Sequence, residues 1–425
     1  LKLLNELNIQ YILGGDAIQA FVDMFDTEFD QIQEAQTWAS SHSGTNDEAA
    51  QLVEDFADWG ADLLLLRLPL ERYKDWLHTA LKAAQRLQLQ RAESVHYGNL
   101  GIVHRQLNNF ESAIYCLQSA LQGSQKLNDL ELQGLWQGNL GNVYLDMKEH
   151  LKAEEHFSIA LKIATELKDN RRIGLWLGNL ATVHAQRLDY QKAYGHYEEA
   201  YKYHLEVGDK RSSSHTLDNM GNVLSKLERL EEALDCHAKA LKLAEELGDE
   251  LMVAHATGNL AASLSLQGRY VDALKMHQRS LKSFEKLGDI PEQLLEYSRI
   301  ANILSILGND HESQQCYRHM LILNQAIRDP NYELEAYSGL GYTARMMNDL
   351  KTAFGYHQHA LAIAQQNQNK NGEQQQLGLI GLVLYEAKAY EQALTHHQQA
   401  LAIAESLDDE WSVGQHLGNI ANIYN

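Results

Sequence analysis

The sequence has 425 residues and a formal net charge of −21, because 57 acidic side chains outnumber 36 basic ones. That balance argues against nucleic-acid binding and against docking on an anionic membrane, since both depend on clustered Lys and Arg. The expected partner is a basic or neutral protein or peptide. Only three prolines occur, and Ala, Leu, Gln and Glu are plentiful, so the chain can form many uninterrupted helices.

Residues 1–50 are expected to form a helical arm or an N-terminal capping segment. The stretch Phe25–Ile32 leads into Ala35 and Trp38-Ala39 on one expected helix. The stretch Ser40–Asp47 is rich in Ser, Asn and Asp and is expected to be a polar loop.

Residues 51–90 resemble a degenerate copy of the repeat that follows them. The pair Ala80-Leu81 stands one repeat length before the pair Ala120-Leu121. Gly60-Ala61 lie near the corresponding position of a first helix.

From residue 91 onward the sequence repeats itself with a 40-residue period, without insertion or deletion. The string Gly98-Asn99-Leu100-Gly101 returns in related form at residues 138–141, 178–181, 258–261 and 418–421. Eight copies fill residues 91–410, and a truncated ninth copy occupies residues 411–425. A fixed period of this length is the signature of a solenoid of stacked units.

Each copy contains two segments with apolar residues at helical spacing. In the first copy, Leu100 and Gly101 share one face of the first helix, and Ala113, Leu117 and Ala120 share one face of the second. One such pair cannot bury its apolar face alone, so neighbouring pairs must stack. The expected fold is all-α: a right-handed α-solenoid, or superhelix, of stacked antiparallel helix pairs.

The end of each copy carries a capping signal. Asp and Asn are preferred helix N-caps, each worth about 1 kcal/mol. Gly208 and Gly248 precede two of these residues and are expected to end the preceding helix in the left-handed conformation. The capping register contains Asp129, Asp169, Asp209, Asp249, Asp289, Asp329, Asn369 and Asp409.

The three cysteines, Cys116, Cys236 and Cys316, occupy one register of different copies and are never in adjacent copies. Stacked helices lie about 8–10 Å apart, so cysteines two or more copies apart are too distant for a disulfide. Three small buried thiols in a reducing, cytoplasmic environment are expected.

The repeat resembles the tetratricopeptide motif. Leu100, Gly101, Ala113 and Ala120 fall where that motif has its Leu-Gly and its two alanines, although its late proline is missing and the usual length is about 34 residues. The 40-residue period is similar to the repeats of Pins-like polarity adaptors and kinesin light chains. The resemblance implies an array that binds a protein or peptide, with the first helices lining the concave face.

The segment Phe25–Ala39 resembles the helical arm of bacterial signal-transducing ATPases of the NB-ARC or STAND type. That resemblance implies the ligand-sensing region of a STAND-type NTPase whose nucleotide-binding module, with its ATP and Mg²⁺, lies upstream of Leu1. Oligomerisation could then come from the upstream module. A generic capping helix explains the same pattern. A free-standing adaptor, or a regulatory array for an attached protease or other effector, remains an alternative.

Asparagines recur in two registers of the first helix, three residues apart and therefore on one stripe. Asn can donate and accept, so such a stripe can bind the backbone of an extended peptide of any sequence, as the family resemblance also implies. An alternative is that these residues serve only helix–helix contacts. We call this set the asparagine ladder: Asn99, Asn139, Asn142, Asn179, Asn219, Asn222, Asn259 and Asn302.

Other residues around the ladder are candidates for ligand contact. His215 and His255 lie one turn before it, and Arg105 and Arg345 could anchor an acidic ligand group. The neighbouring glycines, such as Gly98, each cost about 1 kcal/mol in a helix, so they must permit close packing or make room for a ligand. In the last copies the ladder registers hold Arg299, Gly339, Leu379, Tyr342 and Leu382 instead.

No catalytic set can be assembled from the sequence. It contains no P-loop, no His-Glu-x-x-His and no Gly-x-Ser-x-Gly motif, so neither enzymatic activity nor a cofactor is expected within these residues. Zinc needs three or four converging ligands, and the regularly spaced histidines of the second helices are better explained by packing. These are His156, His196 and His396 in one register, and His237, His277, His357 and His397 in the next.

Overall fold

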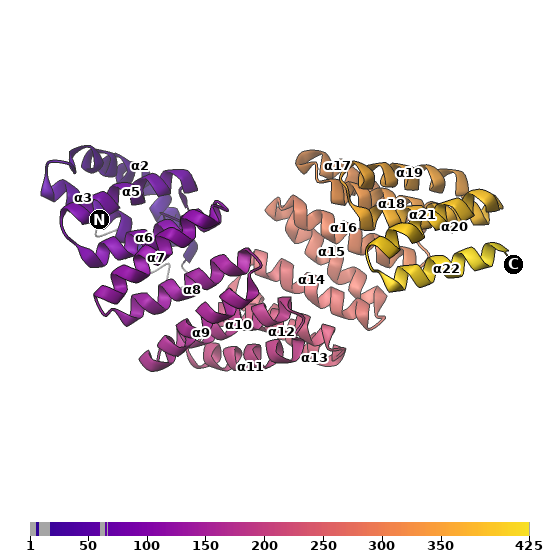
Figure 1. Cartoon of the computed structure of the whole chain (residues 1–425). Coiled ribbons are helices and arrows are strands. Elements are labelled where there is room, and N and C mark those ends of the chain that lie inside the picture. The colour runs from indigo at the N-terminus through magenta and orange to yellow at the C-terminus, as the bar shows by residue number, and fades with distance from the viewer. Residues whose placement is uncertain (1–5, 8–17, 60–63, 66, 425) are drawn as a thin grey trace. The chain divides into compact units, whose positions relative to one another are not determined.

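The computed structural model describes residues 6–7, 18–59, 64–65 and 67–424 (Figure 1). Every regular element in these ranges is a helix, and consecutive helices pack as pairs. The expected all-α solenoid of stacked pairs is thus confirmed. Gly60 and Ala61 lie outside the described residues.

The helices follow the 40-residue period of the sequence. The first helices of the pairs are α6 (Gln90–Gln106), α8 (Leu130–Asp146), α10 (Asn170–Gln186), α12 (Lys210–Lys226), α14 (Glu250–Leu266), α16 (Ile290–Ile306), α18 (Pro330–Met346), α20 (Lys370–Glu386) and α22 (Glu410–Tyr424). The second helices are α7 (Phe110–Lys126), α9 (His150–Leu167), α11 (Tyr190–Glu206), α13 (Leu230–Leu247), α15 (Tyr270–Leu287), α17 (Asp310–Ile327), α19 (Leu350–Gln366) and α21 (Tyr390–Ser406).

Short turns with one left-handed residue separate these helices. Such residues recur at regular intervals from Gln88 to Asp408, so the turn inside a pair and the turn between pairs share this feature. Five of the positions are glycines, including the expected Gly208 and Gly248. The others carry side chains, although a left-handed backbone costs such residues about 1–2 kcal/mol.

The predicted N-caps are confirmed in every copy. The side chain of Asp129 accepts a hydrogen bond from the backbone N–H of Leu132, at 3.1 Å. An equivalent bond forms at the starts of the later first helices, from Asp169 to Asp409, with Asn369 accepting it in the eighth copy. Each cap satisfies a backbone donor that the helix itself leaves without a partner.

Small residues on the second helices form the centre of the core. The first alanine of the motif is completely buried in seven copies: Ala113, Ala153, Ala193, Ala233, Ala273, Ala353 and Ala393. Ser313 takes this place in the sixth copy, and its buried hydroxyl donates to the Ala301 carbonyl at 2.8 Å. Close approach of the paired helices therefore explains why a small residue recurs at this position along the chain.

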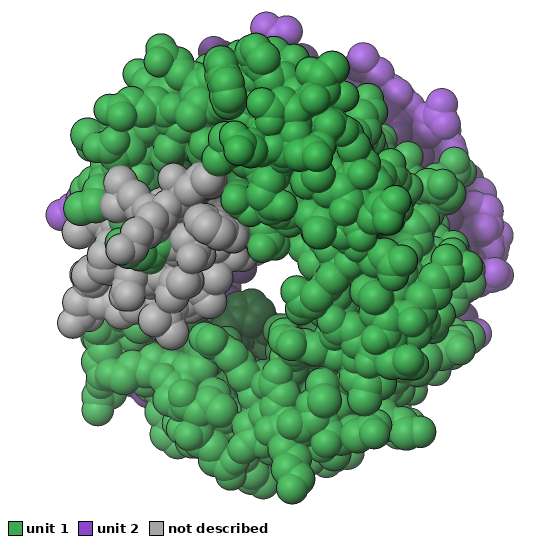
Figure 2. All heavy atoms as spheres, turned by 90° about the vertical axis from the view of Figure 1, so that its left-hand side faces the viewer, with its two compact units in different colours: residues 1–248 green, residues 249–425 purple. Residues whose placement is uncertain are grey.

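The chain divides into two compact units, residues 1–248 and 249–425. Within each unit some neighbouring first helices approach one another: α6 and α8, α10 and α12, α16 and α18, α18 and α20, and α20 and α22. No two neighbouring second helices come as close among the described residues. Because a stack is concave on the side where its helices are closer, the first helices line the concave face of each unit. Figure 2 shows the hollow at the centre of unit 1.

The helices that precede the regular array and whose full bounds lie in the described residues are α2 (Ile18–His42), α3 (Asp47–Trp59) and α5 (Leu70–Arg86). The helix expected after Phe25 is confirmed, and Phe25 and Ala39 are completely buried on it. The predicted polar loop was too long, because α2 continues to His42 and Asp47 already begins α3. Side-chain hydrogen bonds explain the end of α2 and the start of α3. His42 bonds the Trp38 carbonyl at 2.8 Å in the last turn of α2, and the Asn46 side chain accepts from the Glu48 N–H at 2.8 Å at the start of α3.

Candidate functional site

The asparagine ladder lies on the first helices, which line the concave face of each unit. Asn222 and Asn302 are exposed, and the other six side chains are half-buried. Six members belong to unit 1, whereas Asn259 and Asn302 belong to unit 2. The helical spacing brings the two registers onto one stripe, as expected.

Several ladder amides keep hydrogen-bonding capacity. Asn139 donates to the Leu135 carbonyl of its own helix at 3.0 Å, and Asn179 donates to Asn142 of the preceding copy at 3.3 Å. Asn222 and Asn259 form no side-chain hydrogen bond with any other described residue. An Asn side chain has two donor hydrogens and an accepting oxygen, so most of this capacity is not used by hydrogen bonds within the described residues.

Arg105 and Arg345 already have acidic partners. Arg105 forms an ion pair with Asp146 at 3.3 Å, and Arg345 forms one with Glu386 at 2.6 Å. Each pair joins the first helices of adjacent copies. An acidic ligand group would therefore have to compete with a carboxylate of the chain itself.

The two ladder histidines differ in their surroundings. His215 is exposed in unit 1, where its Nδ1 lies 3.4 Å from the Asn219 amide. His255 is exposed in unit 2, with its ring 5.1 Å from that of Phe284 in an edge-on arrangement. His215 is thus placed to act together with a ladder amide.

Most of the glycines beside the ladder allow close packing between copies. A Cβ added to Gly98 or Gly138 would lie within 3.0 Å of ring carbons of Trp136 or Trp176, each from the first helix of the next copy. Gly258 and Gly378 are covered in the same way by Glu296 and His416. Gly178 differs, because nothing lies within 4 Å of the corresponding point. The sequence left close packing and room for a ligand as the two explanations of these glycines. Close packing applies to Gly98, Gly138, Gly258 and Gly378.

The second-helix histidines of the register that contains His237 are core residues, whereas His156, His196 and His396 of the other register are half-buried. His237, His357 and His397 pack over Gly221, Gly341 and Gly381 of their own copies, where any Cβ would collide with the ring. Burial lowers the pKa of His357 and of His397 to about 4. The equivalent place holds Phe157 over Gly141 in the second copy. Among the described residues, no group of three His, Cys, Asp or Glu side chains is arranged to hold a metal ion.

One histidine belongs to a buried charged cluster. His277 lies 2.6 Å from one carboxylate oxygen of Glu296, and Arg299 donates to the other at 2.8 Å. Glu296 is only 1% exposed. The Arg299 that replaces Asn in the ladder register therefore pairs with Glu296 within α16, and the contact between His277 and Glu296 joins α15 to α16.

The three cysteines are free, as expected. Burial raises the pKa of each thiol to about 11. Thiols with such values are weak nucleophiles at neutral pH, which agrees with a packing role.

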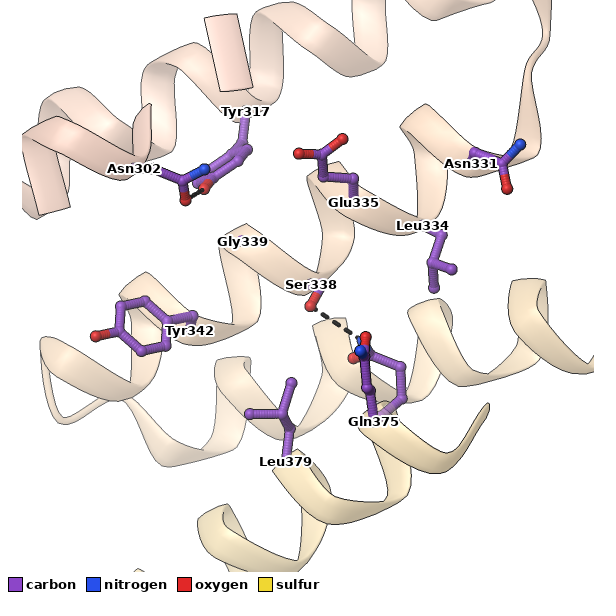
Figure 3. Close-up of a pocket in the computed structure, with 11 residues that line it drawn as sticks. Asn302, Tyr317, Asn331, Leu334, Glu335, Ser338, Gly339, Tyr342, Gln375 and Leu379 are labelled. Atoms are coloured by element: carbon purple, nitrogen blue, oxygen red, sulfur yellow. Dashed lines mark hydrogen bonds between the residues drawn. The ribbon is translucent and has the colours of Figure 1, made fainter. Parts of the chain in front are cut away.

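A pocket of about 360 Å³ lies where the ladder ends, and sequence reasoning did not find it (Figure 3). Its lining includes Asn302, Tyr317, Glu335, Tyr342 and Leu379, from helices α16, α17, α18 and α20. The change in ladder chemistry was visible in the sequence. The pocket itself depends on Tyr317, which comes from a second helix and lies over Gly339, so residue spacing on the first helices gave no signal for it.

A membrane-spanning helix is not found in the described part of the chain, where every helix is too short or too polar for one. Family models described as tetratricopeptide repeat match residues 95–129, 132–205, 212–286 and 294–366. No curated protein matches the sequence.

Similar solved structures come from several signalling proteins. A STAND protein with a tetratricopeptide repeat sensor from Pyrococcus horikoshii is 17% identical, with a TM-score of 0.57; the match covers 77% of this chain and 49%, about half, of that protein. The apo quorum sensor NprR from B. thuringiensis is 18% identical, with a TM-score of 0.52 and coverage of 72% and 83%. A Rap protein complexed with competence and sporulation factor is 14% identical, with a TM-score of 0.51 and coverage of 85% and 99%. At these identities the likeness shows the fold alone.

Proposed function

Because this chain belongs to the tetratricopeptide-repeat family, we propose that it binds a peptide, or an extended segment of another protein, along the concave face of its first helices. Stacked repeats present extended concave surfaces of this kind. The observation that carries the proposal is the row of ladder amides with unused donors and acceptors. Such amides can bind peptide backbone without reading its sequence.

We further propose that the array is the ligand-sensing region of a STAND-type NTPase. The Phe25–Ala39 pattern on α2 and the fold shared with a STAND tetratricopeptide sensor support this role. ATP and Mg²⁺ would belong to a nucleotide-binding module on the N-terminal side, and assembly of the parent protein would depend on that module. Ligand in the groove would then change the contact between the array and the module.

The groove is tested with random linear peptides, about 16 residues long, displayed on phage and selected on the whole chain. Extended peptides of this length reach about 50 Å, which spans several stacked helices. A selected peptide is synthesised, and its affinity is measured for the wild type and for the double variant Asn139→Ala, Asn179→Ala. Each lost neutral hydrogen bond is worth about 0.5–1.5 kcal/mol, so the dissociation constant should rise about 5- to 150-fold.

The fold should tolerate this double change. Asn139 bonds only its own helix, and Asn179 loses a single 3.3 Å bond to Asn142 of the preceding copy. Ala is the better helix former at both positions, which offsets part of this loss. The control is Gln118→Ala with Gln122→Ala, which removes two exposed amides from α7 outside the ladder and should leave affinity unchanged. A lower melting temperature with full affinity would show that the ladder is structural and would refute the binding groove.

The sensor role is tested by the native gene. A P-loop and a downstream acidic Mg²⁺-binding motif should be encoded on the N-terminal side of Leu1. A coding region with no nucleotide-binding module there would contradict the sensor role. That outcome would favour a free-standing adaptor, or an array that regulates an attached protease or other effector.

A further inference from the structure

The pocket in unit 2 continues the ladder with different chemistry. Asn302, Gly339, Tyr342 and Leu379 of its lining occupy the two ladder registers of the sixth to eighth copies. In earlier copies these registers hold mainly asparagines. The pocket therefore lies on the ladder stripe of unit 2, at a place where aromatic, aliphatic and acidic side chains replace the asparagines.

The pocket has apolar and aromatic walls. Leu334 and Leu379 contribute aliphatic surface from α18 and α20, and Figure 3 shows them on the side opposite Asn302 and Tyr317. The Tyr317 ring lies over Gly339, where a Cβ would be within 3.0 Å of its carbons. Its hydroxyl donates to Asn302 Oδ1 at 2.8 Å, which holds the ring in place.

Glu335 is the one charged side chain among the residues that line the pocket. Its carboxylate accepts a hydrogen bond from Ser298, and no described Lys or Arg forms an ion pair with it. Two arginines on these helices pair with other carboxylates: Arg299 binds Glu296, and Arg345, whose guanidinium lies 5.6 Å from the centre of the Tyr342 ring, binds Glu386. Burial, and after it the negative charge of Glu335, raise the pKa of Tyr317 above its usual range.

The other polar side chains of the lining can both donate and accept hydrogen bonds, so Glu335 alone sets the charge preference of the pocket. Gln376 donates to Ser338 Oγ at 3.0 Å, while its oxygen lies 3.0 Å from His357 Nδ1. The bond from Gln376 holds the Ser338 hydroxyl at the pocket wall, and the Ser338 oxygen can still accept one further hydrogen bond. A ligand group that enters should therefore carry a positive charge and hydrogen-bond donors.

We propose that this pocket binds a Lys or Arg side chain of the peptide in the groove. The inference rests on the proposed function. The aliphatic walls suit the methylene stem of such a residue, because long basic side chains cover apolar surface with their stems and keep the charged end at a polar partner. Glu335 supplies that partner. A peptide N-terminal amine carries the same charge but no such stem, so we assign the pocket to a side chain.

The test uses the same random peptides selected on the wild-type chain. Lys or Arg should be enriched at one position. A selected peptide is then synthesised with an acetylated N-terminus, so that only its side chain can supply the cation. A charged hydrogen bond is worth about 1.5–3 kcal/mol, so Glu335→Gln should raise the dissociation constant of this peptide about tenfold or more.

The matched control is Glu333→Gln, which removes the same charge nearby on α18 from a side chain that does not line the pocket. It should change affinity less than about twofold. Replacing the peptide's basic residue by Gln should weaken binding to the wild type and have little effect on Glu335→Gln. That coupling separates direct contact from a general change in charge. Unchanged melting curves for both variants complete the control.

The outcomes distinguish the two proposals. If peptides that bind unit 2, as shown by lost affinity on Asn259→Ala, carry no basic residue or do not respond to Glu335→Gln, the cation pocket is wrong and the groove stands. If only the free amine binds at Glu335, acetylation abolishes the effect and the side-chain assignment is wrong. If no peptide is selected at all, the result counts against both.

Discussion

Two equivalent glycines should respond to the same substitution with opposite signs. Gly138 on α8 and Gly178 on α10 occupy one register of adjacent copies. A Cβ at Gly138 would lie within 3.0 Å of three ring carbons of Trp176, whereas a Cβ at Gly178 would meet nothing within 4 Å. The substitutions Gly138→Ala and Gly178→Ala therefore add the same methyl group in the same helical setting, but only one of them forces a neighbour to move.

The magnitudes follow from two opposing effects. Replacing a helical Gly by Ala gains about 1 kcal/mol at either position. At Gly138 the nearest Trp176 ring carbon would lie 2.1 Å from the added Cβ. The ring must therefore withdraw by about 1.5 Å to reach normal contact distance, and overpacking of this kind costs about 1–3 kcal/mol. Gly178→Ala should thus stabilise the protein by about 1 kcal/mol. The helix gain cancels in the comparison, so Gly138→Ala should be less stable than Gly178→Ala by about 1–3 kcal/mol.

Urea denaturation followed by circular dichroism measures the free energy of unfolding of both variants, and hydrogen exchange of α8 and α10 shows where protection changes. Trp176→Leu provides a further check, because a smaller side chain opposite Gly138 should reduce the cost of Gly138→Ala. Equal stabilities for the two alanine variants, or no coupling to Trp176→Leu, would refute the packing explanation of these glycines.

The buried charges allow two further predictions. Glu296→Ala leaves His277 and Arg299 without their buried carboxylate and should destabilise the protein by about 3–5 kcal/mol in urea denaturation; a loss below about 1 kcal/mol would contradict the cluster's structural role. The buried His357 has a pKa of about 4, below the ordinary 6.5, so its contribution is complete above pH 6.5 and declines by about 3 kcal/mol as pH falls to 4. His357→Phe, which copies the place of Phe157 over Gly141, should remove this part of the acid sensitivity; equal losses between pH 7 and 4.5 in variant and wild type would contradict the reasoning.

The regular features of the fold could be predicted because they depend on spacing alone. The 40-residue period places each helix, and the Asp129 register marks each N-cap, since a cap is a local interaction within the first turn of a helix. The buried alanines follow from helical periodicity in the same way. These features need no knowledge of how one copy meets the next.

Contacts between copies were harder to predict. The collision of Gly138 with Trp176 depends on the orientation of a large ring across the stack, and the pairing of Arg105 with Asp146 depends on the offset between neighbouring first helices. The pocket beside Glu335 requires a side chain from a second helix as well. The polar loop after α2 was overestimated because Ser and His were taken only as loop formers, although His42 there caps the helix end.

The short reach of the packing contacts also bears on how the protein is made. Within each of the two units, each described helix of the repeats packs against the next helix in the chain and, for some first helices, against the one after that. A ribosome adds about 5–20 residues per second, so one 40-residue copy emerges in roughly 2–8 s, far longer than a helix pair needs to form. Each new pair can therefore dock on the completed pair before the next one appears. During synthesis only the growing end of the stack exposes an apolar face, and it does so for seconds, which limits the time in which nascent chains can aggregate.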